Sequence, residues 1–434
     1  MKDFTRVNEQ AERGALGRVV AEPIETDVLV VGAGPGGSAA GYHLARHGID
    51  VTVVDKATFP REKVCGDGLT PRSVGAIQRM GVDTDDPGFE RVIGLRVHSK
   101  DATVDLPWPE LRTWPNFGLV MPRLGFDHLL LERAEKAGAH ILQATEARRP
   151  LIDDGWVVGA ESVAADDPDG ESVEIRARYT VAADGAASRF AAHAGVRRDP
   201  NRPLGIAARR YYRAPNLSGP WFESWLDLWE QDMLLPGYGW LFPMADGRVN
   251  LGGGLLSTFR NFKDVSAARL FAAFARMLPP ERGISEETAD GPMLSGPLPM
   301  SLNRAPQAVP GLLVVGDAAG AVNPMNGEGI AYAIETSELA SELLYEALLN
   351  DRPALAMSYP LALRERYGRY FSIGRGFARL IGKPEIMGPA TKYLLPNRRV
   401  MAFALRLLGN LTDGRDGDAQ DRLFYVLERL ARAS

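Results

Sequence analysis

The sequence predicts an α/β fold with a Rossmann-like dinucleotide-binding domain, a second domain built on an antiparallel sheet, and a C-terminal helical region. Three observations lead to this prediction. Residues 27–31 form an apolar run typical of a buried parallel strand, and a glycine-rich turn and an alanine-rich helical stretch at 36–47 follow it. Residues 200–260 hold many aromatic side chains in short extended segments. From residue 351 onward the apolar spacing is helical.

Composition limits the classes of function that the chain can serve. Its 434 residues are enough for two or three domains. The 50 basic and 55 acidic residues give a net charge of −5, which argues against nucleic-acid binding. Cys65 is the only cysteine, so an internal disulfide and a cysteine metal cage are both excluded. The polar start and the lack of a long apolar run predict neither a signal peptide nor a membrane span, and we expect a cytoplasmic protein.

The glycine-rich turn at residues 30–37 fits the pattern G-x-G-x-x-G. Gly32 permits the tight turn, Gly34 lets a pyrophosphate approach the backbone, and Gly37 lets the helix pack on the strand. Asp55 follows the next strand and is placed to accept hydrogen bonds from a ribose hydroxyl. A carboxylate there would repel a 2′-phosphate, so we do not expect NADP as the bound nucleotide. The fingerprint alone leaves NAD and FAD open.

Two further strand-to-turn segments narrow the cofactor. Residues 180–189 run into an Asp184-Gly185 turn, and residues 312–320 run into a Gly316-Asp317 turn before a helix. These segments resemble the Asp-Gly and Gly-Asp motifs of the flavoprotein hydroxylases. The resemblance implies an FAD-binding domain of the flavoprotein hydroxylase (glutathione-reductase-like) type. It also implies that Asp317 hydrogen-bonds the ribityl chain and that Arg123 lies along the FAD.

Three more segments resemble the geranylgeranyl reductase family of FAD-dependent oxidoreductases. Residues 59–72 are similar to its P-x-x-K-x-C-G-x-G-L segment, residues 236–243 to its Y-x-W-x-F-P motif, and residues 323–330 to the loop beside the isoalloxazine ring. The resemblance covers roughly residues 27–410 and is closest to the actinobacterial menaquinone reductases. It implies saturation of a C=C bond in the isoprenoid chain of a lipid, with a hydride from reduced flavin and a proton from the protein.

The motifs and the resemblance together define a set of candidate FAD contacts. In chain order these are Gly32, Gly34, Pro35, Gly36, Gly37, Asp55, Lys56, Lys63, Cys65, Gly66, Arg123, Asp184, Gly316, Asp317, Gly327, Gly329 and Ile330. An isolated alkene is not polarised, so an apolar pocket is needed beside the flavin. The aromatic-rich stretch that contains the Y-x-W-x-F-P motif supplies the candidates for its wall: Trp221, Trp225, Tyr238, Trp240 and Phe242.

Cys65 and Glu328 are the two candidates for the proton donor. Lys63 or a nearby helix terminus would lower the pKa of the Cys65 thiol. The alternatives for Cys65 are an inert buried thiol and a wall residue that shapes the pocket. The alternative for Glu328 is a carboxylate favoured by the dipole at a helix N-terminus.

The C-terminal segment 362–412 carries ten basic and two acidic residues, or +8, which leaves −13 for the rest of the chain. Apolar residues at 400–411 repeat at helical spacing, and a basic, apolar helix suits the surface of an anionic bilayer. We therefore expect a peripheral location on the inner face of the cell membrane. The alternative is a helix that caps the flavin domain and turns its basic face to solvent.

The same segments suggest a division of the chain into domains. We expect a polar lead-in at 1–26, an FAD-binding domain at 27–95, 121–195 and 296–350, a substrate domain at 96–120 and 196–295, and a helical region at 351–434. A monooxygenase of the same fold and a non-catalytic prenyl carrier are the alternative functions, although a carrier has no need of the FAD motifs. The chain has no second G-x-G-x-x-G, so the electron donor is either transiently bound NAD(P)H or a redox protein.

Overall fold

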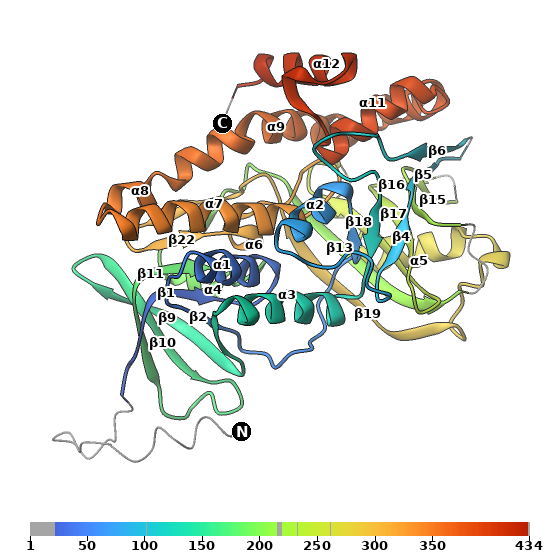
Figure 1. Ribbon diagram of the computed structural model, residues 1–434. Coiled ribbons are helices and arrows are strands. Elements are labelled where there is room, and N and C mark those ends of the chain that lie inside the picture. The colour runs from blue at the N-terminus through green and yellow to red at the C-terminus, as the bar shows by residue number, and fades with distance from the viewer. Residues whose placement is uncertain (1–21, 101, 215–218, 232, 261, 433–434) are drawn as a thin grey trace.

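Two large sheets lie side by side, and helices from the C-terminal region cross above them (Figure 1). The computed structural model describes residues 22–432 apart from 101, 215–218, 232 and 261. Residues 1–21 of the predicted lead-in lie outside the described residues, and the first strand begins at Ile24. The predicted combination of a parallel sheet, an antiparallel sheet and C-terminal helices is confirmed.

The first sheet has a parallel core of five strands. Their order is β22 (Leu312–Val314), β11 (Val173–Ala182), β1 (Ile24–Val31), β2 (Val51–Val54) and β8 (His140–Leu142). All four β2 residues and the last four of β1 are buried, as expected for strands covered on both faces. Antiparallel strands extend the sheet at β21 (Ala308–Val309), β10 (Trp156–Ala164) and β9 (Thr145–Asp153).

Helices cover this sheet and connect its strands. The long ones, α1 (Pro35–Arg46), α3 (Arg123–Ala137) and α7 (Ile330–Leu349), pack against one another through α1. Shorter helices begin or end near the cavity described below: α2 (Pro71–Arg79), α4 (Arg189–His193) and α6 (Gly316–Ala319). Most of the largest hydrophobic cluster lies between this sheet and its helices.

The second sheet has seven strands. Their order is β19 (Ala289–Pro299), β13 (Leu204–Arg213), β18 (Arg248–Leu256), β17 (Gly237–Pro243), β14 (Trp221–Trp225), β5 (Gly94–His98) and β6 (Thr103–Pro107). All of its neighbours pair antiparallel except β14 and β5. Helix α5 (Ala267–Met277) covers one face with its buried Leu270 and Phe274, which leaves the other face for a ligand.

Small elements join these parts. They are the three-stranded sheet β3 (Gly68–Leu69), β7 (Gly118–Val120) and β4 (Glu90–Val92), the pairs β12 (Arg197–Arg198) with β20 (Arg304–Ala305) and β15 (Leu228–Glu230) with β16 (Met233–Leu235), and the 3-10 helix η1 (Pro280–Arg282). The C-terminal region is helical, as predicted. It contains α8 (Pro353–Met357), α9 (Tyr359–Ile381), α10 (Pro384–Pro389), the π-helix η2 (Ala390–Leu394), α11 (Arg398–Gly409), the 3-10 helix η3 (Gly414–Asp416) and α12 (Ala419–Leu430).

The glycine-rich turn connects β1 to α1 and brings the helix very close to the strand. Gly32 has φ +97°, a left-handed conformation that favours glycine. A Cβ on Gly37 would overlap the carbonyl oxygen of Gly32, so only glycine fits there. The N-terminus of α1 therefore points into the space at the carboxyl ends of β1 and β11.

Replacing Gly37 by alanine tests this close packing. The added methyl group meets backbone that cannot rotate away, so we expect the free energy of unfolding to fall by about 1–3 kcal/mol. Urea denaturation measures the change. The matched control is Gly376→Ala in α9, where a Cβ would have no neighbour within 4 Å; we expect a gain of about 0.5–1 kcal/mol there. A Gly37→Ala protein as stable as the wild type would contradict the packing argument.

Candidate active site

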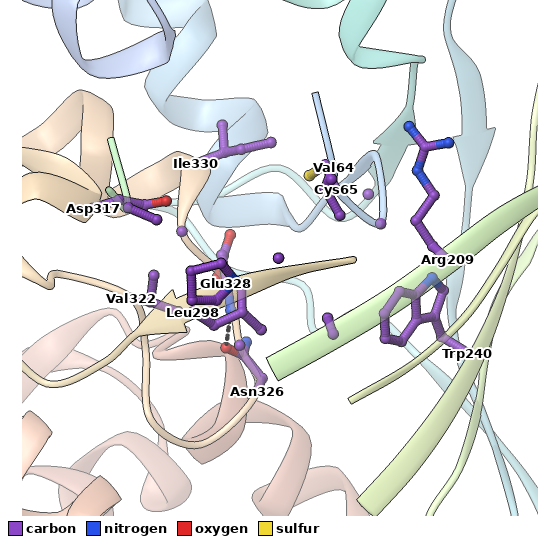
Figure 2. A pocket seen from close by; sticks show the side chains of 18 of the residues that line it. Val64, Cys65, Arg209, Trp240, Leu298, Asp317, Val322, Asn326, Glu328 and Ile330 are labelled. Carbon is purple, nitrogen blue, oxygen red and sulfur yellow. Dashed lines mark hydrogen bonds between the residues drawn. The ribbon is translucent and has the colours of Figure 1, made fainter. Parts of the chain in front are cut away.

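One cavity of about 1440 Å³ runs between the two sheets and under the C-terminal helices. Its wall takes residues from the glycine-rich turn, the loop after β2, strands β13 and β17, and helices α6, α7, α9 and α11. Figure 2 shows Trp240 and Arg209 on one side of the pocket and Asp317, Val322, Glu328 and Ile330 on the other. The cavity is therefore shared by both sheets.

Sixteen of the seventeen predicted FAD contacts line this cavity, and the exception is Gly37, which packs on Gly32 instead. Asp55 lies on the wall at the end of β2. Its carboxylate accepts hydrogen bonds from the backbone amides of Ala33 at 2.8 Å and Ala57 at 2.9 Å. The carboxylate thus fixes the glycine-rich turn and keeps further lone pairs for a ligand hydroxyl.

The wall near the turn has the features that FAD needs. Oδ1 of Asp184 is buried and has no hydrogen-bond partner in the described part of the chain. A Cβ on Gly34 would meet only the Arg61 guanidinium, at 3.5 Å, so a pyrophosphate can approach this backbone. Burial raises the pKa of both Asp184 and Asp317. Ligand hydroxyls would satisfy such carboxyl groups, and the residues present therefore fit FAD.

An aromatic strip forms the wall on the side of the seven-stranded sheet. Tyr238, Trp240 and Phe242 alternate along β17 and all line the cavity. Gly254 and Gly252 are the cross-strand neighbours of Tyr238 and Trp240 on β18. A Cβ on Gly252 would overlap the Trp240 ring, so the indole lies directly on the backbone of the sheet.

The structure does not bring Trp221 and Trp225 to the cavity. Phe222, between them on β14, lines it instead, with its ring centroid 4.4 Å from that of Phe242. Side chains alternate along a strand, so the two tryptophans lie on the other face. There Trp225 stacks on His98 with centroids 4.2 Å apart, and the Arg96 guanidinium lies 5.3 Å from the Trp221 ring.

A polar junction joins the Cys65 loop to the aromatic strip. Asn250 on β18 accepts a hydrogen bond from Trp240 Nε1 at 3.0 Å and donates to the Cys65 carbonyl at 2.9 Å and to Asp67 Oδ2 at 2.8 Å. The Tyr211 hydroxyl also donates to Asp67, at 2.6 Å. Burial raises the pKa of Asp67 to about 6, although these donors oppose the rise. The segments at 59–72 and 236–243, which carry two of the family resemblances, are therefore joined by hydrogen bonds.

Cys65 is half-buried on the cavity wall, beside the Arg123 guanidinium. The sequence predicted that Lys63 or a helix terminus would lower the pKa of its thiol. That prediction was wrong, because burial raises the pKa and Arg123 offsets only part of the effect. The group on the wall is therefore a neutral thiol.

Glu328 also lies on the wall, with 9% of its surface exposed. Its Oε1 accepts hydrogen bonds from the hydroxyls of Thr70, at 2.5 Å, and Ser73, at 2.7 Å. These hydroxyls belong to the N-cap and first turn of α2, so the carboxyl group is held by α2 rather than by the N-terminus of α7, the helix that begins two residues later. Burial raises the pKa of Glu328.

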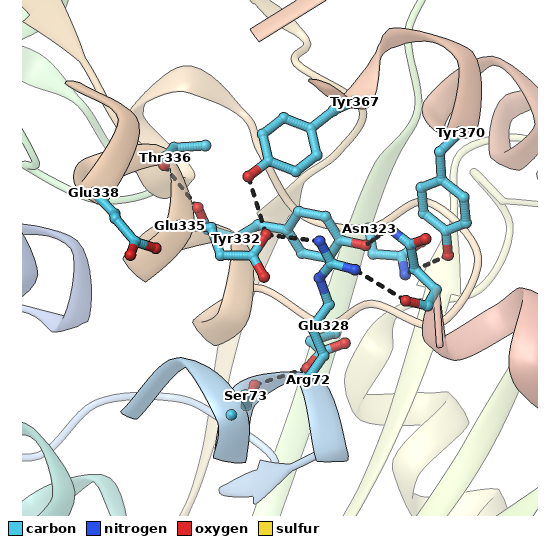
Figure 3. A network of polar contacts seen from close by, with 12 residues as sticks. Arg72, Ser73, Asn323, Glu328, Tyr332, Glu335, Thr336, Glu338, Tyr367 and Tyr370 are labelled. Carbon is cyan, nitrogen blue, oxygen red and sulfur yellow. Dashed lines mark hydrogen bonds and ion pairs between the residues drawn. The ribbon is translucent and has the colours of Figure 1, made fainter. Parts of the chain in front are cut away.

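A buried ion pair lies behind Glu328 (Figure 3). Arg72 on α2 donates to Glu335 Oε2 on α7 at 2.8 Å, and the Tyr367 hydroxyl on α9 donates to the same oxygen at 3.0 Å. Arg72 also donates to the Asn410 carbonyl at 2.9 Å. This network ties the C-terminal helices to the wall that carries Glu328.

Helix α11 turns its apolar face inward. Met401 and Leu405 are buried and line the cavity together with Ala404, Leu407 and Leu408. The face that was expected to contact a bilayer therefore packs on the protein, because it closes the cavity roof. None of the described helices is long and apolar enough to cross a membrane.

Comparison with known proteins identifies the family. The FAD binding domain family matches residues 25–229. A menaquinone reductase of Mycolicibacterium smegmatis is 37% identical over 393 residues, which cover 90% of this chain and 93% of that protein. Digeranylgeranylglycerophospholipid reductase 2 of Methanopyrus kandleri is 30% identical over 80% of this chain and 84% of its own length. The chain belongs to the geranylgeranyl reductase family of FAD-dependent oxidoreductases.

Solved structures agree with the fold of this reductase family. A geranylgeranyl bacteriochlorophyll reductase-like protein of Thermoplasma acidophilum matches with a TM-score of 0.68 and 23% identity. The match covers 88% of this chain and all of that one. The predicted family and fold class are confirmed, and FAD is the cofactor.

Asn250→Ala tests the polar junction. The change leaves the Trp240 indole N–H without its acceptor and removes one of the donors to Asp67, so we expect the free energy of unfolding to fall by about 1–3 kcal/mol. The pKa of Asp67 should rise above 6, because a donor that favours its carboxylate is lost. Urea denaturation and an infrared titration of the carboxyl groups measure the two effects.

The matched control is Asn350→Ala at the end of α7. The Asn350 amide hydrogen-bonds only to Glu346, at the exposed surface. We expect its stability to change by less than about 0.5 kcal/mol. An unchanged Asp67 pKa in the Asn250 variant would contradict the junction.

Proposed function

We propose that this protein is an FAD-dependent reductase that saturates a C=C bond in the prenyl tail of menaquinone. One observation carries the proposal. A single cavity runs from the glycine-rich turn of the FAD-binding family to the aromatic strip of Tyr238, Trp240 and Phe242. The relatives named above are reductases of menaquinone and of a digeranylgeranyl lipid, and both of these molecules carry isoprenoid chains.

The residues on the cavity wall have separate roles in this proposal. The glycine-rich turn and the N-terminus of α1 hold the pyrophosphate, Asp55 holds the ribose, Asp317 holds the ribityl chain, and Arg123 lies along the FAD. Bound FAD supplies a hydride when it is reduced. NAD(P)H or a redox protein delivers the electrons, and dithionite replaces either donor in the experiments below.

The aromatic strip binds the hydrocarbon chain and excludes water. Phe222 on the neighbouring strand and Trp240 on the same strand both pack near Phe242, with ring centroids 4.4 and 6.3 Å from its own. Aromatic rings give a prenyl chain a large contact area. Because the alkene is not polarised, the dry wall also has to offer a proton as the hydride arrives.

The cavity mouth suits the surface of an anionic membrane on the inner face of the cell. Four residues of the C-terminal helices line the cavity and are also exposed: Leu380 at 48%, Ile386 at 38%, Leu394 at 50% and Val400 at 38%. Exposed cations flank this apolar rim: Arg379, Lys383, Lys392, Arg398 and Arg399. A lipid tail would enter through the rim while the cations bind phosphate headgroups.

Product mass tests the reaction. Dithionite-reduced enzyme is incubated with menaquinone, and the products are oxidised in air before mass spectrometry so that any quinol returns to quinone. We expect a gain of two hydrogens per turnover, located in the tail by fragmentation. Heat-denatured enzyme with the same flavin and dithionite is the control. A gain of one oxygen would instead support a monooxygenase, and an unchanged tail mass would refute the proposal.

Vesicle binding tests the membrane contact. We expect the protein to co-sediment with phosphatidylglycerol vesicles and much less with phosphatidylcholine vesicles. Leu394→Glu should weaken this binding, and Lys383→Ala and Lys392→Ala should each weaken it by about 1 kcal/mol. The matched control is Ile152→Glu, at a residue of β9 that is 57% exposed and does not line the cavity. Equal binding by the Leu394 and Ile152 variants would refute the contact.

A further inference from the structure

We propose that Glu328, and not Cys65, is the acid that protonates the alkene carbon as the neighbouring carbon receives the hydride. The inference rests on the proposed function and names the proton donor of that reaction. In this step the π bond breaks and two C–H bonds form. The electron pair comes with the hydride from reduced FAD, which is oxidised, and the O–H bond of Glu328 breaks to leave a carboxylate. Water restores the proton before the next cycle.

The hydrogen bonds of Glu328 locate the proton. Oε1 accepts from both the Thr70 and the Ser73 hydroxyls, so the acid proton of the neutral form belongs on the other oxygen. That oxygen, Oε2, is buried and has no partner in the described part of the chain. Figure 2 shows the Glu328 carboxyl group directed toward the side of the pocket where Ile330 and Cys65 lie. Glu328 lines the cavity, so an O–H with no acceptor among the described residues can reach a bound substrate once the carboxyl group turns toward it.

The surroundings also stabilise the carboxylate that remains after the proton leaves. The two hydroxyl donors favour the anion, and the Arg72 guanidinium acts in the same direction. Glu335 opposes them but is itself paired with Arg72. Tyr332 on α7 and Tyr370 on α9 also face this carboxyl group, and burial keeps both phenols neutral. The site therefore shifts Glu328 toward its neutral form through burial and still offers donors to the anion that remains after the proton leaves.

Cys65 lacks these features. Burial raises the pKa of a thiol that is already a weak acid, which makes proton release harder. Its closest charged neighbour, Arg123, is also engaged by the Asp127 carboxylate. No pair of hydroxyl donors is seen at Cys65 among the described residues. The geometry therefore gives Cys65 a place on the pocket wall rather than the role of acid.

Glu328→Gln removes the proton and keeps the shape of the side chain. We expect the single-turnover rate of tail saturation by dithionite-reduced enzyme to fall by about 10²–10⁴-fold. The absorption spectrum of bound FAD and its reduction by dithionite should not change. Glu338→Gln is the matched control, because Glu338 on α7 also contacts α2, through Arg79, but does not line the cavity. Its rate should equal that of the wild type.

The pH dependence separates an acid from a structural carboxyl group. The wild-type rate should fall as pH rises through the pKa of Glu328, because only the neutral form donates. Ser73→Ala removes a donor that favours the carboxylate, so the pKa rises and this fall should move to higher pH. Cys65→Ser should keep the fall at its wild-type position. A role confined to packing would leave the profile of the Ser73 variant unshifted.

A second readout does not depend on turnover. Infrared difference spectra of wild type minus Glu328→Gln should contain the band of a protonated carboxyl group at neutral pH. The pH at which the band disappears should match the fall in rate. The proposal is overturned if the band is absent, if Glu328→Gln saturates the tail at the wild-type rate, or if Cys65→Ser abolishes the pH dependence. If wild-type enzyme adds no hydrogen to the tail, the proposed function itself has failed.

Discussion

The hydrogen bonds of Asn250 tie the loop after β2 to the seven-stranded sheet at the place where the cofactor end of the cavity meets the aromatic end. A single amide fixes the Trp240 indole, the Cys65 carbonyl and the Asp67 carboxyl group. The partners are separated by 10, 185 and 183 positions in the chain. This junction lies beside the cavity and does not fill it. The cavity can therefore continue from the cofactor end to the aromatic end. Both the position of the aromatic strip and the course of the Cys65 loop depend on it.

Burial gives the cavity wall a consistent electrostatic character. It raises the pKa of the Cys65 thiol and of four carboxyl groups there: Asp67, Asp184, Asp317 and Glu328. Each is thereby shifted toward its neutral form, since a low-polarity surrounding disfavours an isolated charge. An alkene chain on the aromatic strip then meets polar groups whose charged forms are disfavoured by burial. The chemistry of adding a hydride and a proton to an unactivated double bond suits such a wall.

Local patterns in the sequence were enough to predict the fold and the cofactor end of the site. The glycine-rich turn and the Gly316-Asp317 turn act through backbone geometry within a few residues, and Asp55 is found by its place at the end of the next strand. The substrate end depends on long-range contacts. The sequence places aromatic residues on both faces of β14 but does not show which face meets the cavity, so Trp221 and Trp225 were expected on the wall that Phe222 lines. The glycine run beside Asn250 was the one local signal that rings pack on that strand.

The hydroxyl partners of Glu328 could not be predicted from the sequence for a related reason. Thr70 and Ser73 lie more than 250 positions away and belong to a helix whose contact with α7 no pattern indicates. The charge of the C-terminal segment was visible, but the direction of its apolar face was not. Amphipathic spacing indicates that the apolar face of a helix is covered, but it does not indicate whether protein or lipid covers that face. Here the protein covers most of α11, and the exposed apolar residues form only a rim.

The glycines of β18 have a consequence for the range of chains that the cavity can accept. With Gly252 and Gly254 under Trp240 and Tyr238, the aromatic rings rest on bare backbone and the slot gains the thickness of one side-chain layer. The absence of side chains at these two glycines therefore sets the width that is available to a branched hydrocarbon. The selectivity for the lipid chain can therefore change without a new contact to the lipid. A methyl group added at Gly252 or Gly254 would push the ring above it into the cavity and narrow the slot.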